Sequence, residues 1–109
     1  MKKGTIGAEP AGWIGGPWNW DVPLAIGYAT EGIDEPHRHT QQFEIYLVAS
    51  GTATANIDGV EVPLAAGDVL VVEPREVRSF RDSSTDYRCF VLHAGGDGGS
   101  DKEIVRSSQ

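Results

Sequence analysis

The 109-residue chain is poor in cysteine, in basic residues and in long hydrophobic runs. Cys89 is its single cysteine, so no disulfide can form within the chain, and this fits a reducing compartment. The chain contains nine Lys and Arg residues and sixteen Asp and Glu residues, which gives a net charge of −7. Proteins that bind nucleic acids or anionic membrane surfaces usually carry basic patches instead. No apolar run approaches the roughly 18 residues of a transmembrane segment. We therefore expect neither a nucleic-acid nor a membrane partner.

Helical periodicity is also lacking, while the chain contains 14 glycines and six prolines. Short apolar runs such as residues 69–72 are instead separated by turn residues, which predicts strands. Asp58 and Gly59 join two such runs, and Asp-Gly between strand residues is a strong hairpin signal. We predict one all-β domain of seven or eight antiparallel strands, folded as a sandwich or small barrel.

Three regions follow from the composition. Residues 1–21 form a Trp- and Gly-rich arm, expected to pack on the barrel or on a partner subunit, or to cover a pocket as a lid. Residues 22–94 form the barrel, and the Gly-rich residues 95–109 form a flexible tail, unless 104–105 add a strand to a neighbour's sheet. The first residues lack the apolar core of a signal peptide, so we expect a cytoplasmic protein.

Histidine is scarce, and two of the three histidines lie two positions apart, at His37 and His39. On an extended strand both side chains leave from the same face. If the polar residues 40–42 form a turn, the next strand pairs with the first and brings Glu44 beside both imidazoles. Two imidazoles and a carboxylate suit Fe, Mn, Ni, Cu or Zn, with positions left open for substrate or oxygen. The alternative is a pair of solvated loop histidines and an edge carboxylate.

The spacing around these residues resembles the first motif of the cupin superfamily, which is a Gly, five residues, His-x-His, three or four residues, Glu, six residues and a Gly. Here Gly32 precedes His37 by one residue fewer than usual, while the distances from His39 to Glu44 and on to Gly51 both match. The resemblance implies a jelly-roll β-barrel, commonly dimeric, so we expect a homodimer.

The second cupin motif is a Gly, five residues, Pro-x-Gly, two residues, His, three residues and an Asn. Gly67 and the strand that follows it fit the start of this motif. Four later positions depart from it, and they are Glu73, Arg75, Arg78 and Asp82 in place of the Pro, Gly, His and Asn. Cupin metal sites usually take a third histidine from this motif, so the replacement at Arg78 matters most.

Two outcomes follow for the site. In the first, His37, His39 and Glu44 hold a divalent transition metal, Arg78 orients a small polar or anionic substrate, and Tyr46, on the strand face of Glu44, lines the cavity. This outcome predicts an enzyme, with oxygenase (dioxygenase-like) chemistry first and isomerase, epimerase or lyase chemistry next.

In the second outcome, Arg78 takes the place of the ion and pairs with Glu44. The protein is then a metal-free ligand-binding or sensory cupin whose Arg78 binds a carboxylate or phosphate, or an enzyme that uses His37 or His39 as a general base. Cys89 and His93 could also face the pocket, although such residues more often only pack.

Overall fold

A computed structural model describes residues 1–32, 34–95 and 101–106. Across these residues it contains ten strands and no helix, hence no helix able to cross a membrane. The strands are β1 (Ala11–Gly15), β2 (Ala25–Ala29), β3 (Asp34–His39), β4 (Phe43–Ser50), β5 (Thr52–Ile57), β6 (Val60–Ala65), β7 (Val69–Val72), β8 (Arg78–Arg81), β9 (Arg88–Ala94) and β10 (Lys102–Ile104).

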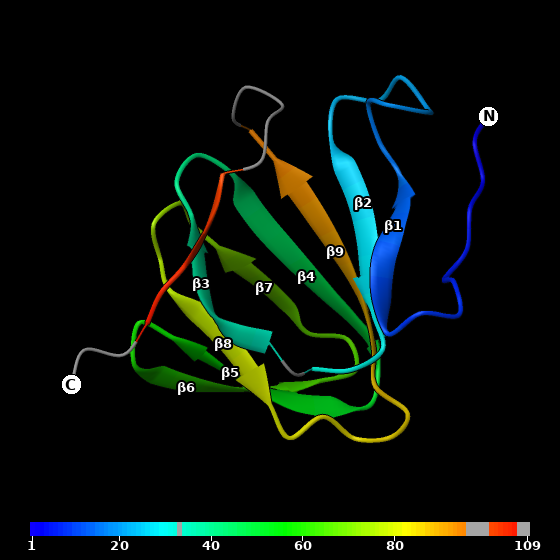
Figure 1. Ribbon diagram of the computed structural model, residues 1–109. Helices are drawn as coiled ribbons and strands as arrows, with labels where there is room; N and C mark the ends of the chain where they lie inside the picture. Colours follow the sequence, from blue (N-terminus) through cyan, green and yellow to red (C-terminus); the bar gives the residue numbers. More distant parts are fainter. Residues whose placement is uncertain (33, 96–100, 107–109) are drawn as a thin grey trace.

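The strands form two five-stranded antiparallel sheets that face each other (Figure 1). One sheet has the order β1-β2-β9-β4-β7 and the other the order β10-β3-β8-β5-β6. The predicted all-β class is confirmed. So is the hairpin between β5 and β6, because Asp58 and Gly59 both adopt the positive φ angles, 49° and 88°, that a tight two-residue hairpin turn requires.

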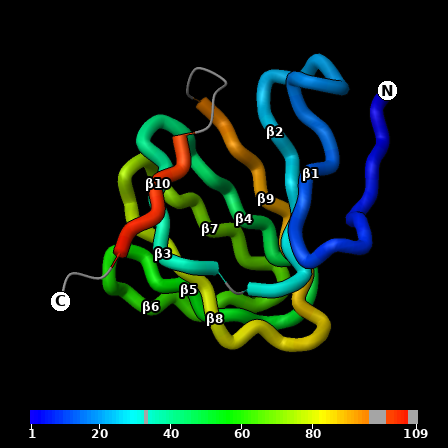
Figure 2. The backbone as a smooth tube through the Cα atoms, viewed as in Figure 1, coloured from blue at the N-terminus to red at the C-terminus, as the bar shows by residue number. Residues whose placement is uncertain are grey.

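The chain has more strands than the seven or eight predicted, because the arm and the tail each add one. In the arm, β1 pairs with β2 at the edge of the first sheet. Past residue 100, β10 lies beside β3 at the edge of the second sheet (Figure 2). In the register of this pairing, Lys102 is opposite His39 and Ile104 is opposite His37. Residues 102–104 therefore extend a sheet of their own chain, in contrast to the flexible tail or the neighbour's sheet that we expected.

The expected pairing of the two strands that carry the first motif is wrong. β3 and β4 belong to different sheets, so residues 40–42 carry the chain from one sheet to the other. Glu44 therefore approaches the histidines across the interior of the sandwich. The carboxylate still reaches both imidazoles, because the inward faces of the two sheets meet there.

The interior is layered along β4, whose alternate residues Glu44, Tyr46 and Val48 all point inward and are buried. Val48 and Tyr46 lie within an apolar cluster completed by Ala53, Ala55, Leu64, Val72, Phe80, Tyr87, Cys89 and Val91. The layer of Glu44 is polar and contains the buried His37, His39 and Arg78. The apolar side chains thus form the hydrophobic core, and the polar layer packs against one end of it.

Gly51 is a motif residue at which the fold leaves no room for a side chain. Its φ is +74°, and an added Cβ would lie 2.6 Å from the backbone N and Cα of Tyr87. Gly59 has a similar φ of +88° but open space around it. We predict that Gly59→Ala lowers the free energy of unfolding by about 1–2 kcal/mol, and that Gly51→Ala costs clearly more because of the added clash. Urea denaturation measures both; equal losses would contradict this packing.

Candidate functional site

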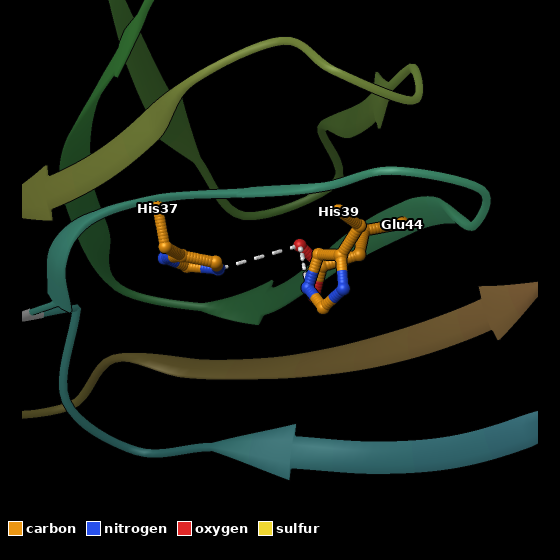
Figure 3. Close-up of side chains that lie close together, drawn as sticks. All are labelled: His37, His39 and Glu44. Atoms are coloured by element: carbon orange, nitrogen blue, oxygen red, sulfur yellow. Dashed lines mark ion pairs between the residues drawn. The ribbon is translucent and has the colours of Figure 1, made fainter. Parts of the chain in front are cut away.

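Glu44 lies at the centre of the polar layer, facing the two histidines of β3 (Figure 3). Its Oε1 is 3.3 Å from Nε2 of His39 and 3.8 Å from Nε2 of His37. The three side chains are buried, and their candidate ligand atoms all lie within 4.8 Å of one another. The structure thus brings together the three residues that the first motif predicted.

The far nitrogen of each imidazole is held by an oxygen. His37 Nδ1 is 3.0 Å from the carbonyl oxygen of Glu35, and His39 Nδ1 is 2.7 Å from Oδ1 of Asp101. Since both partners are acceptors, each Nδ1 carries a hydrogen and donates it. The Nε2 atoms consequently face Glu44, which is the orientation that outer hydrogen bonds give to metal-bound histidines.

Arg78 enters the same cluster from β8, where it pairs in register with His37. The side chain is fully buried; its Nη1 donates to Glu44 Oε1 at 2.8 Å and its Nη2 donates to the carbonyl oxygen of Glu73 at 3.0 Å. This is the charge-assisted pair of the second predicted outcome. Arg75 supports the register of the second motif, because it adopts a φ of +73° at the position where the motif has a glycine.

Tyr46 and His93 complete the shell around the carboxylate. The Tyr46 hydroxyl donates to Glu44 Oε1 at 2.8 Å, and His93 Nε2 lies 3.0 Å from Glu44 Oε2. The close contact of Tyr46 agrees with its predicted place in the cavity. His93 shares the face of β9 that carries the buried Cys89 and Val91, and this alternation is the only sequence signal that points it into the pocket.

Asp101 is the functional candidate that the sequence reading missed. Besides His39, it accepts hydrogen bonds from the backbone N–H groups of Gln41 and Gln42, at 2.7 and 2.8 Å. The residue thereby ties the beginning of β10 to the crossing segment between β3 and β4. It lies directly after a Gly-rich stretch, so no local signal in the sequence marks it.

These contacts shift the ionisation of the cluster. Burial alone would raise the pKa of Glu44, but hydrogen bonds with His37, His39 and His93 outweigh burial and hold this pKa far below its ordinary range. Burial alone would lower the pKa of His39, and the hydrogen bonds with Glu44 and Asp101 outweigh it and raise this pKa above 6.5. Burial and the charge of Glu44 raise the pKa of Tyr46, so the phenol keeps its proton and donates it.

Donor type and spacing allow His37, His39 and Glu44 to hold a metal ion. Oε1 of Glu44 already accepts hydrogen bonds from Arg78 and Tyr46, which opposes a metal on that atom. An ion on Oε1 would also lie within several ångströms of the Arg78 guanidinium, which costs affinity unless an anion lies between the two cations. A metal on Oε1 therefore requires Arg78 to move away from Glu44.

The polar layer forms one wall of a cavity of about 670 Å³. This volume suits a small organic molecule. The three histidines, Glu44, Tyr46 and Asp101 line the cavity, and so do the aromatic residues Trp13, Trp18, Tyr28, Phe80 and Tyr87. The site is therefore a pocket with polar groups at one end and aromatic surface elsewhere.

Two facing β-sheets with a histidine–carboxylate cluster inside a pocket are the architecture that the resemblance to cupins implied. The model of the cupin domain family matches residues 26–95, and the chain belongs to this family. Curated proteins give no significant sequence match.

Solved structures of similar fold include enzymes. A variant of PAC13 from Streptomyces with bound uridine is 16% identical, with a TM-score of 0.75 over 97% of this chain and 92% of that one; Pac13 is described as a nucleoside dehydratase. KdgF from a Halomonas species is 18% identical, with a TM-score of 0.67 over 84% and 86% of the two chains. A structure described with DMSP lyases is 23% identical, with a TM-score of 0.66 over 88% of this chain and 53% of that one.

The buried pair of Glu44 and Arg78 can be tested by a double-mutant cycle. We predict that Arg78→Met lowers the free energy of unfolding by about 3–5 kcal/mol, because it leaves a buried carboxylate without its cation. Adding Glu44→Gln should recover a large part of this loss. Urea denaturation of the four proteins gives the coupling; losses that simply add would contradict the pairing.

Asp101 should control the ionisation of His39. In metal-free protein, Asp101→Asn should lower the pKa of His39, because the anion that helps to raise it is gone; NMR titration of the imidazole measures this. In the wild type, the stability that His39 contributes is fully present below its unfolded pKa of about 6.5 and is lost as the pH rises through the higher folded pKa. Asp101→Asn should reduce this loss, and an unchanged pKa would show that the contact at 2.7 Å does not form in solution.

Proposed function

We propose that this cupin is a metal-independent acid–base enzyme that eliminates water from a small, hydroxylated carbonyl compound in its cavity. His39 would be its main proton-transfer residue. The observation that carries the proposal is the position of His39 between two carboxylates, with Asp101 at 2.7 Å from Nδ1 and Glu44 at 3.3 Å from Nε2. An imidazole held in this way is oriented and can carry a proton at the cavity wall.

The charges of the cluster also favour a metal-free site. Glu44 and Asp101 are two anions, and the Arg78 guanidinium together with a protonated His39 supplies two cations. The cluster is therefore neutral without an ion. A divalent metal with neutral His39 would leave one uncompensated positive charge in a buried layer, which is costly unless an anionic ligand accompanies it.

Elimination matches the groups that are present. An imidazole is a moderate base, so the proton it removes must be acidic, as it is on a carbon next to a carbonyl group. When this C–H bond breaks and the C–O bond of a hydroxyl on the next carbon breaks with it, a conjugated double bond forms. The proton delivered by the acid turns the departing hydroxyl into water, so no oxidant or reductant is needed.

His93 is the natural counterpart of His39 in this step. Their ring centroids are 5.3 Å apart, and both residues line the cavity. His93 has the most exposed side chain of the three histidines, at 13%. We assign proton donation to the leaving hydroxyl to His39. We assign proton removal from carbon to Nδ1 of His93, the ring nitrogen that does not face Glu44 and that lies 3.3 Å from the side-chain amide of Gln42. The similarity of fold to a nucleoside dehydratase and to DMSP lyases supports the same reaction class.

A metal-dependent oxygenase or isomerase is the second candidate, favoured by the anchored Nδ1 atoms of both β3 histidines. In that case His37, His39 and Glu44 would hold the ion, and Arg78 would turn from Glu44 toward an anionic substrate. The bound metal would supply Lewis acidity or oxygen activation.

A ligand carboxylate or phosphate on Arg78 is disfavoured, because both terminal nitrogens of its guanidinium already have partners within the protein.

We also propose that the chain forms a homodimer. It is supported by the exposed Phe43, Val69 and Val71 on the strands β4 and β7, which would gain from being covered by a second copy.

The proposed reaction is tested with chelator-treated protein and a panel of aldehydes and ketones that carry a hydroxyl on the second carbon from the carbonyl. We predict loss of one water, detected by mass spectrometry, and deuterium exchange at the carbon next to the carbonyl, detected by NMR. His39→Gln should lower the rate by about 10²- to 10⁴-fold.

Arg38→Gln is the matched control, because Arg38 lies between the two histidines on β3 but pairs with Glu103 outside the pocket. This variant should keep the wild-type rate. Turnover that depends on an added metal, or an unchanged rate in His39→Gln, would refute the metal-independent mechanism.

A further inference from the structure

The cavity has an aromatic mouth that the reaction itself does not require. Trp13 and Trp18 line the cavity but keep 55% and 58% of their surface exposed. Their rings meet edge to face at a centroid distance of 5.7 Å. Two large indoles left open to water at a pocket entrance offer apolar, polarisable surface to a ligand.

The backbone holds both indoles in place. Trp13 lies on β1 over Gly27 of β2, where an added Cβ would come within 3.2 Å of the indole, and its ring centroid is 4.9 Å from that of His93. Trp18 packs over Gly16. The turn that carries Trp18 is closed by Asn19, whose Oδ1 accepts a hydrogen bond from the Gly16 N–H at 2.9 Å. The indole surface is thus preorganised beside the histidine cluster.

Charge along the cavity selects against anions. Its lining includes Glu44 and Asp101, whose charges Arg78 and a protonated His39 balance, and also the acidic residues Glu31 and Asp34, while Lys102 is the only lysine or arginine that lines it among the described residues. Since Arg78 is already engaged by Glu44 and Glu73, it adds no free cation. A phosphate or carboxylate would meet net repulsion in this pocket.

From these observations we infer the ligand class: an uncharged molecule with a flat ring at one end and a hydroxylated part at the other, as in a nucleoside. The ring stacks on the face of one indole and meets the edge of the other, because Trp13 and Trp18 lie at 73° to each other, and the hydroxylated part reaches the histidines. The inference rests on the proposed function for the reacting end, and on the aromatic mouth and the acidic lining for the rest. Stacking on an aromatic side chain suits any heterocyclic base, because every base has a π face.

Calorimetric titration with three probes tests the inference: uridine, ribose and uridine 5′-monophosphate. Uridine should bind saturably, ribose at least about tenfold more weakly because it lacks the ring, and the monophosphate more weakly than uridine because of the acidic lining. Absence of uridine binding, equal affinity for ribose, or tighter binding of the monophosphate would each overturn the inference.

Variants locate the ring. Trp18→Ala and Trp13→Ala should each weaken uridine binding by roughly five- to 100-fold, and Trp18→Phe should keep most of the affinity because phenyl still stacks. Trp20→Phe is the control, because Trp20 packs over Gly15 and does not line the cavity. Unchanged affinity in both alanine variants would overturn the inference.

The alternative occupant of the mouth is a second copy of the chain. If Trp18→Ala turned a dimer into a monomer in light scattering while leaving uridine affinity unchanged, the indoles would belong to an interface and the inference would fail. Wild-type protein separates this inference from the proposed reaction. If it binds uridine in a ring-dependent way but eliminates water from no compound of the carbonyl panel, the reaction alone is refuted. If it eliminates water from the panel but does not bind uridine, the ligand class alone is refuted.

Discussion

The buried carboxylate of Glu44 is the group on which the polar half of this protein depends. Five side chains surround it, and these are His37, His39, Tyr46, Arg78 and His93, which come from both sheets. A charge in such a place is tolerated only when it is paired and hydrogen-bonded. The partners are held from their far sides as well, His37 by the carbonyl oxygen of Glu35, His39 by Asp101 and Arg78 by the carbonyl oxygen of Glu73, so they converge on this one carboxylate.

Arg78 decides which chemistry this geometry can perform. In the family pattern a histidine at this position would complete the set of ligands around a metal. Here a guanidinium occupies the position, neutralises Glu44 and leaves the histidines beside an ion pair. Of the two outcomes suggested by the sequence, only the metal-free one pairs Arg78 with Glu44, and the contact at 2.8 Å favours it.

The features of the fold and site that depend on short residue spacings or on a family pattern could be predicted from the sequence. His37 and His39 share a face because of strand alternation, and Asp58 with Gly59 forms the predicted hairpin. The pairing of β3 with β4 failed, because three polar residues can close a hairpin or cross to the other sheet, and only long-range packing selects between these.

Asp101 could not be predicted, since its role arises from β10 lying beside β3, 62 positions from His39. The composition of the tail was misleading for the same reason. Glycine lowers the intrinsic preference for strands, yet an existing sheet edge can still recruit the few residues that follow. Gly27 of β2 makes room for Trp13, Gly15 for Trp20 and Gly16 for Trp18, so the arm is packed, and two of its three indoles line the cavity.

The metal content at equilibrium tests most directly whether Arg78 stands in the place of an ion. Chelator-treated wild-type protein and Arg78→His would each be dialysed against Fe(II), Mn(II), Ni(II) and Zn(II) and analysed by elemental mass spectrometry. We predict that the wild type retains far less than one ion per chain, and that Arg78→His, which restores the histidine of the family pattern, retains close to one. Stoichiometric binding by the wild type, with Arg78 in place, would contradict the claim that the guanidinium stands where the ion would be.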